Sequence, residues 1–388
     1  MAELSSIFES ALAFDPSGDL DAFLKQAPAK WVVYLFADEQ DRPLQLLCVR
    51  NLRASLKRRL GGDETIGRRI PYRQIVRRIH FRRVDNAFEA DWVYFQAARQ
   101  LFPTTYRAMV GFRPAWFIHI NSQTPFPRYT RSTDLTQKTG QLIGPVEDKH
   151  AAARLIQLLE DTFDLCRYYN ILVQAPRGKA CAYKEMGKCP APCDGSISMD
   201  EYHRMIEASA AAAVDPQPFI DRQTAAMRAA ASELKFEAAA KIKSKVEQAS
   251  QLGAGAFRHA RRIEDFQYLS IQRGPRQGIA KVFLITPGRI EELAGLVAEP
   301  AHPGDILRLA LGRAAEVAAN PTDEQGAQVI GLVAHHLFVA KHSNGIFLLL
   351  CSISESALAR AYRELCKQKL AESAEDEEGI VKELQGIE

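Results

Sequence analysis

The sequence predicts a multi-domain α/β protein. Two patterns point to this fold class: β-rich runs alternate with helical patterns in the first and last thirds of the chain, and a cysteine-rich stretch followed by an alanine-rich stretch lies between them. The length of 388 residues is enough for several domains with separate cores. The expected units are a lead-in at 1–29, an α/β domain at 30–135, a cysteine-rich region at 136–215, a helical segment at 216–256, a second α/β domain at 257–370 and an acidic tail at 371–388.

The individual elements follow from hydrophobic periodicity and from turn and cap residues. A basic helix should end at Gly61, and Ser198 with Glu201 forms a capping box that opens a helix at Tyr202. The segment that ends in Gly144-Pro145 is expected to be a loop. Expected strands lie at 31–36, 44–49, 79–84, 116–120, 268–272, 280–285 and 345–352, and expected helices at 51–60, 87–101, 150–165, 219–252, 303–319 and 355–370.

Composition narrows the class of protein. An N-terminal apolar signal and a run of apolar residues long enough to cross a bilayer are both absent from the sequence, so we expect a cytoplasmic protein without membrane contact. The seven cysteines are an odd number and are clustered, which favours a reducing compartment and metal ligation over a disulfide framework.

Positive charge is concentrated between residues 50 and 83, although the net charge is only +3. Asp63 and Glu64 are the only acidic residues in that stretch. A dense basic segment predicts a polyanionic partner, DNA in particular. The candidate phosphate contacts are Arg50, Arg53, Lys57, Arg58, Arg59, Arg68, Arg69, Arg77 and Arg78, with Arg73, Arg82 and Arg83 nearby.

Four cysteines form a candidate metal-ligand set. Cys181, Cys189 and Cys193 lie in a short stretch rich in Gly and Pro, and Cys166 lies upstream at the end of a helical pattern. Four thiolates brought together by such a loop can hold an iron–sulfur cluster or a structural Zn²⁺. The other three cysteines occur singly among apolar residues and are expected in cores.

The central region resembles the bacterial excinuclease subunit UvrC. The resemblance rests on Gly144-Pro145, on the spacing of Cys181, Cys189 and Cys193, and on the Ser198 to Tyr202 capping segment. In that family four thiolates hold a [4Fe–4S] cluster, so the resemblance implies the same cofactor here, with zinc as the alternative. Cys166 falls slightly before the first cysteine position of the family.

The helical segment resembles the UVR motif, a two-helix hairpin that turns near residues 234–237. In UvrC this hairpin docks on UvrB, which implies a UvrB-like partner here. An isolated helix pair has too little core to cover its own apolar face. The docking residues that the resemblance implies are Met227, Leu234, Phe236, Glu237 and Ile242. The alternative is a hairpin packed on its own chain.

The first α/β domain resembles the GIY-YIG nuclease domain, but in a degenerate form. Tyr34 occupies the first tripeptide of the family, whereas Gln45-Leu46-Leu47 replaces the second. Ser55 stands at the position of the catalytic arginine and Tyr94 at that of the metal-binding glutamate. Near Pro103 the family's asparagine is replaced by Tyr106 or Arg107.

Two functions remain after this comparison. The first is a non-catalytic or accessory UvrC-like protein that binds DNA in nucleotide excision repair and docks a UvrB-like partner. The alternative is an active excinuclease-type endonuclease with a rearranged site, in which Tyr34 and Glu89 would be catalytic, with Mg²⁺ or Mn²⁺ bound. In that rearrangement Glu39 could replace Glu89 as the metal ligand, and Arg53 or Arg58 would supply the cation.

The last domain faintly resembles the opening strands of the family's RNase H-like nuclease domain. Asp265, Asp305 and Asp323 lie outside the expected strands, so we expect a remnant without a second active site. His335, His336 and His342 are expected near a strand end in a structural role rather than as metal ligands.

Overall fold

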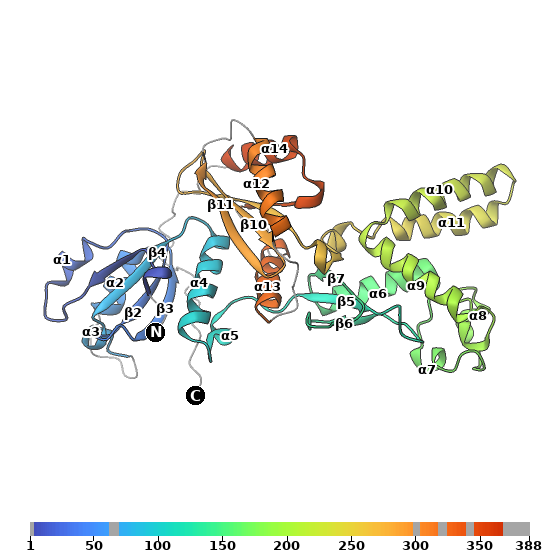
Figure 1. Cartoon of the computed structure of the whole chain (residues 1–388), viewed down its shortest axis with the longest axis horizontal. Coiled ribbons are helices and arrows are strands. Elements are labelled where there is room, and N and C mark those ends of the chain that lie inside the picture. The colour runs from blue at the N-terminus through green and yellow to red at the C-terminus, as the bar shows by residue number, and fades with distance from the viewer. Residues whose placement is uncertain (1–3, 62–69, 298–302, 317–323, 339–344, 368–388) are drawn as a thin grey trace.

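The computed structural model describes residues 4–61, 70–297, 303–316, 324–338 and 345–367. It contains three antiparallel four-stranded sheets, numbered here in chain order. Figure 1 shows an elongated molecule, with the first sheet at one end, a two-helix hairpin at the other, and the third sheet near the middle. The fold class predicted from the sequence, α/β with several units, is confirmed at this level.

The first sheet has the strand order β1-β4-β2-β3. Its strands are β1 (Ser10–Ala13), β2 (Val32–Ala37), β3 (Pro43–Val49) and β4 (Arg78–Arg83). Side chains alternate between its faces, so Tyr34 and Phe36 pack with helix α2 (Leu52–Leu60) on the outer face. The helix α1 (Leu20–Leu24) covers the same face, and α3 (Tyr72–Ile75) follows α2.

The inner face of the first sheet packs against helix α4 (Ala87–Leu101). Val33 and Leu35 point to this side and share a core with Phe88 and Val93 of α4. The short helix α5 (Tyr106–Met109) continues from α4. The same core extends into the third sheet, so α4 packs between the first sheet and the third sheet and joins the two ends of the chain.

The third sheet has the order β11-β10-β9-β12. Its core against α4 includes Phe283 and helix α13 (Glu324–Phe338), while α12 (Pro303–Glu316) and α14 (Glu355–Lys367) cover the opposite face. The sequence did not predict α13, and the expectation that His335 and His336 lie near a strand end is wrong, because both lie in its last turn. The strands are β9 (Tyr268–Arg273), β10 (Ala280–Thr286), β11 (Arg289–Val297) and β12 (Gly345–Leu349).

The second sheet has the order β6-β5-β7-β8 and carries α6 (Lys149–Phe163) and α9 (Met199–Val214) over one core. Gly144-Pro145 lies inside β7 (Gln141–Val146), so the predicted loop there is wrong. The capping box at Ser198 is present, as predicted. The remaining strands are β5 (Trp116–Ile120), β6 (Thr130–Ser132) and β8 (Arg261–Arg262).

The hairpin consists of α10 (Gln217–Ser232) and α11 (Phe236–Ala249), which run side by side and project from the body (Figure 1). The cysteine loop, residues 165–197, joins α6 to α9 through α7 (Tyr169–Leu172), α8 (Ala182–Glu185) and a 3₁₀ turn at Pro192–Asp194. Three further 3₁₀ turns lie at Leu4–Ser6, Gly255–Phe257 and Ile263–Asp265, and another at Leu350–Ser352. Within the described residues, none of the helices combines the length and apolarity needed to span a membrane.

Candidate functional site

Tyr34, the first candidate catalytic residue, is fully buried in the outer core of the first sheet. It sits opposite Leu47 on β3 and Phe81 on β4, and its hydroxyl lies 2.9 Å from Ser55 Oγ on α2. Burial raises the pKa of Tyr34 to about 12. The hydroxyl is therefore a neutral hydrogen-bonding group within a packed core.

Glu89, the second candidate, is a buried structural carboxylate at the start of α4. Its Oε1 accepts a hydrogen bond from Lys281 Nζ on β10 at 2.6 Å, and its Oε2 accepts from the backbone N–H of Asp85 at 2.9 Å. Asp85 also pairs with Lys281, at 2.8 Å. Burial raises the pKa of Glu89, although Lys281 opposes that shift. These contacts bind α4 to the third sheet.

The structure does not bring Tyr34 and Glu89 together. Tyr34 points to the outer face of the first sheet, whereas α4 with Glu89 covers the inner face through Val33 and Leu35. A sheet therefore lies between the two groups. Tyr94, at the position where the family has its metal-binding glutamate, is half-buried at the inner core, where burial raises its pKa to about 12.

The basic residues divide into those tied to the fold and those that face solvent. Arg50 lies over the Trp31 ring at 5.5 Å, and Arg59 donates to Gln45 Oε1 at 3.2 Å. Lys57 and Arg58 are exposed on α2 and make no ion pair or hydrogen bond with the described residues. Arg53 donates to Ala27 O, Arg77 to Gln74 O and Val76 O, and Arg78 pairs with Asp41, while Arg68 and Arg69 lie outside the described residues.

The cysteine loop is held in shape by side-chain and backbone contacts. Lys184 Nζ donates to Asp194 Oδ2 at 2.6 Å and to Ser196 Oγ at 2.7 Å. The backbone N–H of Gly178 donates to Cys193 O at 2.8 Å, and that of Cys166 donates to Tyr202 Oη at 3.2 Å. The loop is thus cross-linked within itself, and its start is fixed against α9.

The four candidate thiols interact in pairs, Cys166 with Cys189, and Cys193 with Cys189 and Cys181. Cys189 and Cys193 are buried, Cys166 and Cys181 are half-buried, and none forms a disulfide. Cys166 and Cys189 are within hydrogen-bonding reach, which raises the pKa of Cys166 and lowers that of Cys189 to about 7. The charges of Cys181 and Cys189 raise the pKa of Cys193, after burial and Asp194.

The thiols suit a soft metal by their chemistry, because thiolates are the ligands of iron–sulfur clusters and of structural zinc. Among the described residues, no three His, Cys, Asp or Glu side chains converge closely enough to hold a single metal ion. The cysteine loop therefore supplies the donors without a closed coordination shell.

The hairpin tip exposes large apolar side chains. Leu234 is 74% exposed and Phe236 is 65% exposed, and Glu237 is exposed beside them. Leu234 has φ of 62°, a left-handed conformation that favours glycine. Met227 and Ile242 are half-buried further down the two helices. A bulky residue is thus held both strained and uncovered at the turn.

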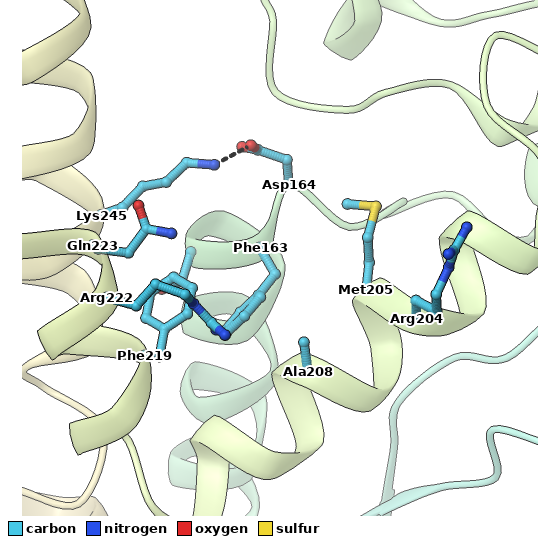
Figure 2. Close-up of a pocket in the computed structure, with 10 residues that line it drawn as sticks. Phe163, Asp164, Arg204, Met205, Ala208, Phe219, Arg222, Gln223 and Lys245 are labelled. Carbon is cyan, nitrogen blue, oxygen red and sulfur yellow. Dashed lines mark hydrogen bonds and ion pairs between the residues drawn. The ribbon is translucent and has the colours of Figure 1, made fainter. Parts of the chain in front are cut away.

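The hairpin base joins the end of α6, next to the cysteine loop, as Figure 2 shows. Lys245 Nζ of α11 donates to Asp164 Oδ2 at 2.5 Å, and the rings of Phe163 and Phe219 lie 4.6 Å apart. A cavity of about 300 Å³ lies between these contacts and α9. Asp164 precedes Cys166 by two positions, so the hairpin and the cysteine loop share one anchor.

Among the described strands of the third sheet, β11 carries two adjacent carboxylates, Glu291 and Glu292, and Glu291 is paired with Arg289 at 2.8 Å. The strands β9, β10 and β12 contain no acidic residue. Asp265 lies in a 3₁₀ turn and Asp305 in α12, while Asp323 and His342 lie outside the described residues. His336 Nε2 lies 3.1 Å from Asp91 Oδ2 on α4, a packing contact between helices.

A family model matches the middle of the chain, and several known proteins are similar to longer parts of it. The family model described as "UvrC/Cho excinuclease, middle domain" matches residues 115–212. The "UvrABC system protein C" of Lachnospira eligens is 23% identical over 303 residues, which cover 74% of this chain and 48% of the relative. Its counterpart in Cyanothece sp. is 25% identical over 302 residues, 75% of this chain and 47% of the relative. The protein of the same name in Syntrophomonas wolfei is 25% identical over 177 residues, 45% of this chain and 29% of the relative.

The middle of the chain is thus similar to the middle domain of UvrC, and longer parts of the chain are similar to UvrC proteins. The chain spans less than half the length of these UvrC relatives. The UvrC middle-domain match contains the second sheet apart from β8, helix α6, the cysteine loop and most of α9. No solved structure matches the chain.

Sequence reasoning missed the groups that bond to the two candidate nuclease residues, Tyr34 and Glu89. Ser55 was recognised as a replacement, but its hydrogen bond to Tyr34 was not. Lys281 was not singled out at all, because it lies 192 positions from Glu89. A lysine inside the apolar run of β10 is a signal that could have found it, since a buried cation needs a carboxylate partner.

Proposed function

We propose that the protein is an accessory UvrC-like protein of nucleotide excision repair, which binds DNA and docks a UvrB-like partner without cutting DNA itself. The observation that carries this proposal is the hairpin tip, where Leu234 and Phe236 are exposed. The relatives are named as components of the UvrABC system, which supplies the biological context.

Docking at the hairpin tip is supported by the free energy that Leu234 costs the isolated chain, because this residue is both left-handed and exposed. A non-glycine residue at a left-handed position costs on the order of 1 kcal/mol, and Leu234 gains no burial here in return. An apolar residue under both penalties is explained by a partner surface that covers it. Glu237 would add a polar contact at the edge of that interface.

DNA binding is supported by the exposed basic side chains of α2. Lys57 and Arg58 lie in its last turn and make no contact with an acidic group of the described residues. Their charges would meet phosphates rather than base edges, so binding should be independent of sequence and weakened by salt.

The proposal that the protein does not cut DNA is supported by the burial and the contacts of the two candidate catalytic residues. Tyr34 is enclosed and bonded to Ser55, and Glu89 is neutralised by Lys281. A divalent metal needs carboxylate oxygens that are free to bind it, and those of Glu89 are already engaged. The residues present therefore do not fit Mg²⁺ or Mn²⁺ at this place.

The cysteine loop is proposed to hold a [4Fe–4S] cluster through Cys166, Cys181, Cys189 and Cys193, with Zn²⁺ as the alternative. The thiols' chemistry and mutual proximity support this. A cluster would brace the anchor that the loop shares with the hairpin at Asp164. The absorbance spectrum of anaerobically purified protein distinguishes the two, since sulfide-to-iron charge transfer colours a cluster and leaves zinc protein colourless.

Docking is tested by the affinity of a purified UvrB-like protein for wild-type chain and for the double variant Leu234→Ala, Phe236→Ala. We expect a loss of at least about 30-fold, as for a buried apolar hot spot. The control is Lys243→Ala, which changes an exposed residue of α11 away from the tip. The docking surface would be contradicted if the double variant bound the UvrB-like protein as tightly as the Lys243→Ala control does.

Catalysis is tested by incubating the protein with the UvrB-like partner, damaged duplex DNA and Mg²⁺ or Mn²⁺. We expect DNA binding without nicking. Nicking that disappears in Tyr34→Phe would overturn the accessory function in favour of an active endonuclease.

DNA binding through α2 is tested with the double variant Lys57→Gln, Arg58→Gln. Loss of salt-sensitive DNA binding in this variant, but not in the control Arg154→Gln on α6, would support the α2 surface.

A further inference from the structure

A second groove, apart from the hairpin and the cysteine loop, lies where the two ends of the chain meet. It has a volume of about 410 Å³ and is bordered by β4, α4 and the start of α13. This volume is within the range of small-ligand sites. Its chemical character comes mainly from Arg82, Trp92, Gln96, Arg99, Gln100 and Gln325.

We propose that this groove holds an unpaired nucleotide of a DNA strand. The proposal rests on the DNA binding proposed above and names the part of the DNA that the joint between the domains would take. The nucleotide's base would stack on Trp92, its edge would meet glutamine amides, and its phosphate would meet an arginine.

One face of α4 supplies most of the groove. Trp92, Gln96, Arg99 and Gln100 are spaced by four, three and one positions, so they lie on adjacent turns of one helix surface. Such a row presents one aromatic and several polar groups along a single wall.

The indole of Trp92 is anchored but not enclosed. Its ring centroid lies 6.0 Å from that of Phe95, which belongs to the core, and Trp92 itself is half-buried. An aromatic ring fixed from one side and open to a groove on the other is the usual stacking platform for a base, because every base has a π face.

The polar groups of the groove are available to a ligand. Within the described part of the chain, Gln96, Arg99, Gln100 and Gln325 make no hydrogen bond or ion pair. Each glutamine amide offers both a donor and an acceptor, as base edges require.

The charge of the groove favours a phosphate. Among the described residues that line it there is no carboxylate, and Arg82 Nε pairs at 3.3 Å with Glu9, a side chain that is 60% exposed. Arg99 therefore keeps an uncompensated positive charge. Ile7, Val93 and Phe95 form the apolar part of the lining. The two arginines, three amides and one indole beside them are the groups that a nucleotide's phosphate and base require.

The test is the affinity of the full chain for a short fluorescein-labelled oligothymidylate and for a duplex of the same length, measured by anisotropy. We expect Trp92→Leu and Gln96→Ala with Arg99→Gln each to weaken single-strand binding about tenfold and to leave duplex binding unchanged. Arg154→Gln, which removes the same charge from α6, should alter neither.

Equal single-strand affinity of the groove variants and the wild type would overturn the proposal while leaving duplex binding on α2 intact. Absence of binding to either DNA would instead overturn the proposed function itself, and with it this inference. Thymidine monophosphate and oligouridylate are the comparison ligands. Loss of affinity confined to either of them, with oligothymidylate unaffected, would contradict a DNA strand as the occupant.

Discussion

The first α/β domain and the hairpin use their side chains in opposite ways. The hydroxyl of Tyr34 and the carboxylate of Glu89 are buried and bonded to groups of the same chain. Leu234 and Phe236, which are apolar, are left in solvent. The two candidate catalytic groups are thus engaged in contacts that stabilise the fold, while two apolar side chains that would normally lie in a core are exposed. This contrast is the basis for proposing that the hairpin contacts a partner, whereas Tyr34 and Glu89 stabilise the fold.

The comparison is sharpened most by Lys281→Met, which leaves Glu89 buried beside Asp85 without a cation. Loss of one partner of a buried ion pair typically costs about 3–5 kcal/mol, and we expect a fall of that order in the free energy of unfolding, measured with urea. The double variant Lys281→Met, Glu89→Gln should recover a large part of it. A stable single variant would show that Glu89 is not structurally engaged.

The next effect concerns His259, a half-buried side chain whose ring packs against Phe338 of α13. Arg258 Nε donates to His259 Nε2 at 3.0 Å, and burial lowers the pKa of His259 to about 4. As pH falls below about 6.5, the unfolded chain takes up a proton that the folded chain refuses, so stability is lost between that pH and about 4. At most about 3 kcal/mol is involved.

Urea denaturation of wild type and His259→Asn across this pH window measures the effect as a difference, which removes the contributions of other titrating groups. The wild type should lose more stability than the variant on acidification. Parallel curves would show that His259 is not held neutral.

A smaller effect is expected from Tyr34→Phe, which removes one buried hydrogen bond to Ser55 and keeps the ring. The loss should be about 1 kcal/mol in the free energy of unfolding, without any change in DNA binding. Ser55→Ala is the matched variant, and in combination with Tyr34→Phe its cost should not add fully, because both remove the same bond. A change in DNA affinity would place Tyr34 in a site instead of the core.

Sequence patterns predicted many of the elements but not the contacts between them. Strands such as β2 and β10 and helices such as α4 and α6 were found because their apolar residues recur with a clear period. Helix α13 was missed because it is buried on nearly every side between two layers, and so has no polar stripe. It also contains Gly331, a poor helix former that is needed where a Cβ would lie 2.8 Å from Arg113 O.

The candidate site was predicted best where its members are close in sequence. The cysteines of the loop and the hairpin tip are local patterns, so each group could be named from a short stretch of sequence. In the structure Cys166 and Cys189 interact directly, and Leu234 and Phe236 are exposed at the tip. Tyr34 and Glu89 could not be placed on opposite faces of a sheet from sequence alone, because this depends on where α4 packs. The groove at Trp92 needs β4 and α13 as well, and no local pattern joins them.

The central claim, that the hairpin tip is kept for a partner, is tested most directly by Leu234→Gly. Glycine relieves the left-handed strain, so the account predicts a chain that is slightly more stable, by about 0.5–1 kcal/mol, and yet binds a UvrB-like protein more weakly, with both quantities measured on the same preparation. Unchanged affinity for the partner would contradict the account.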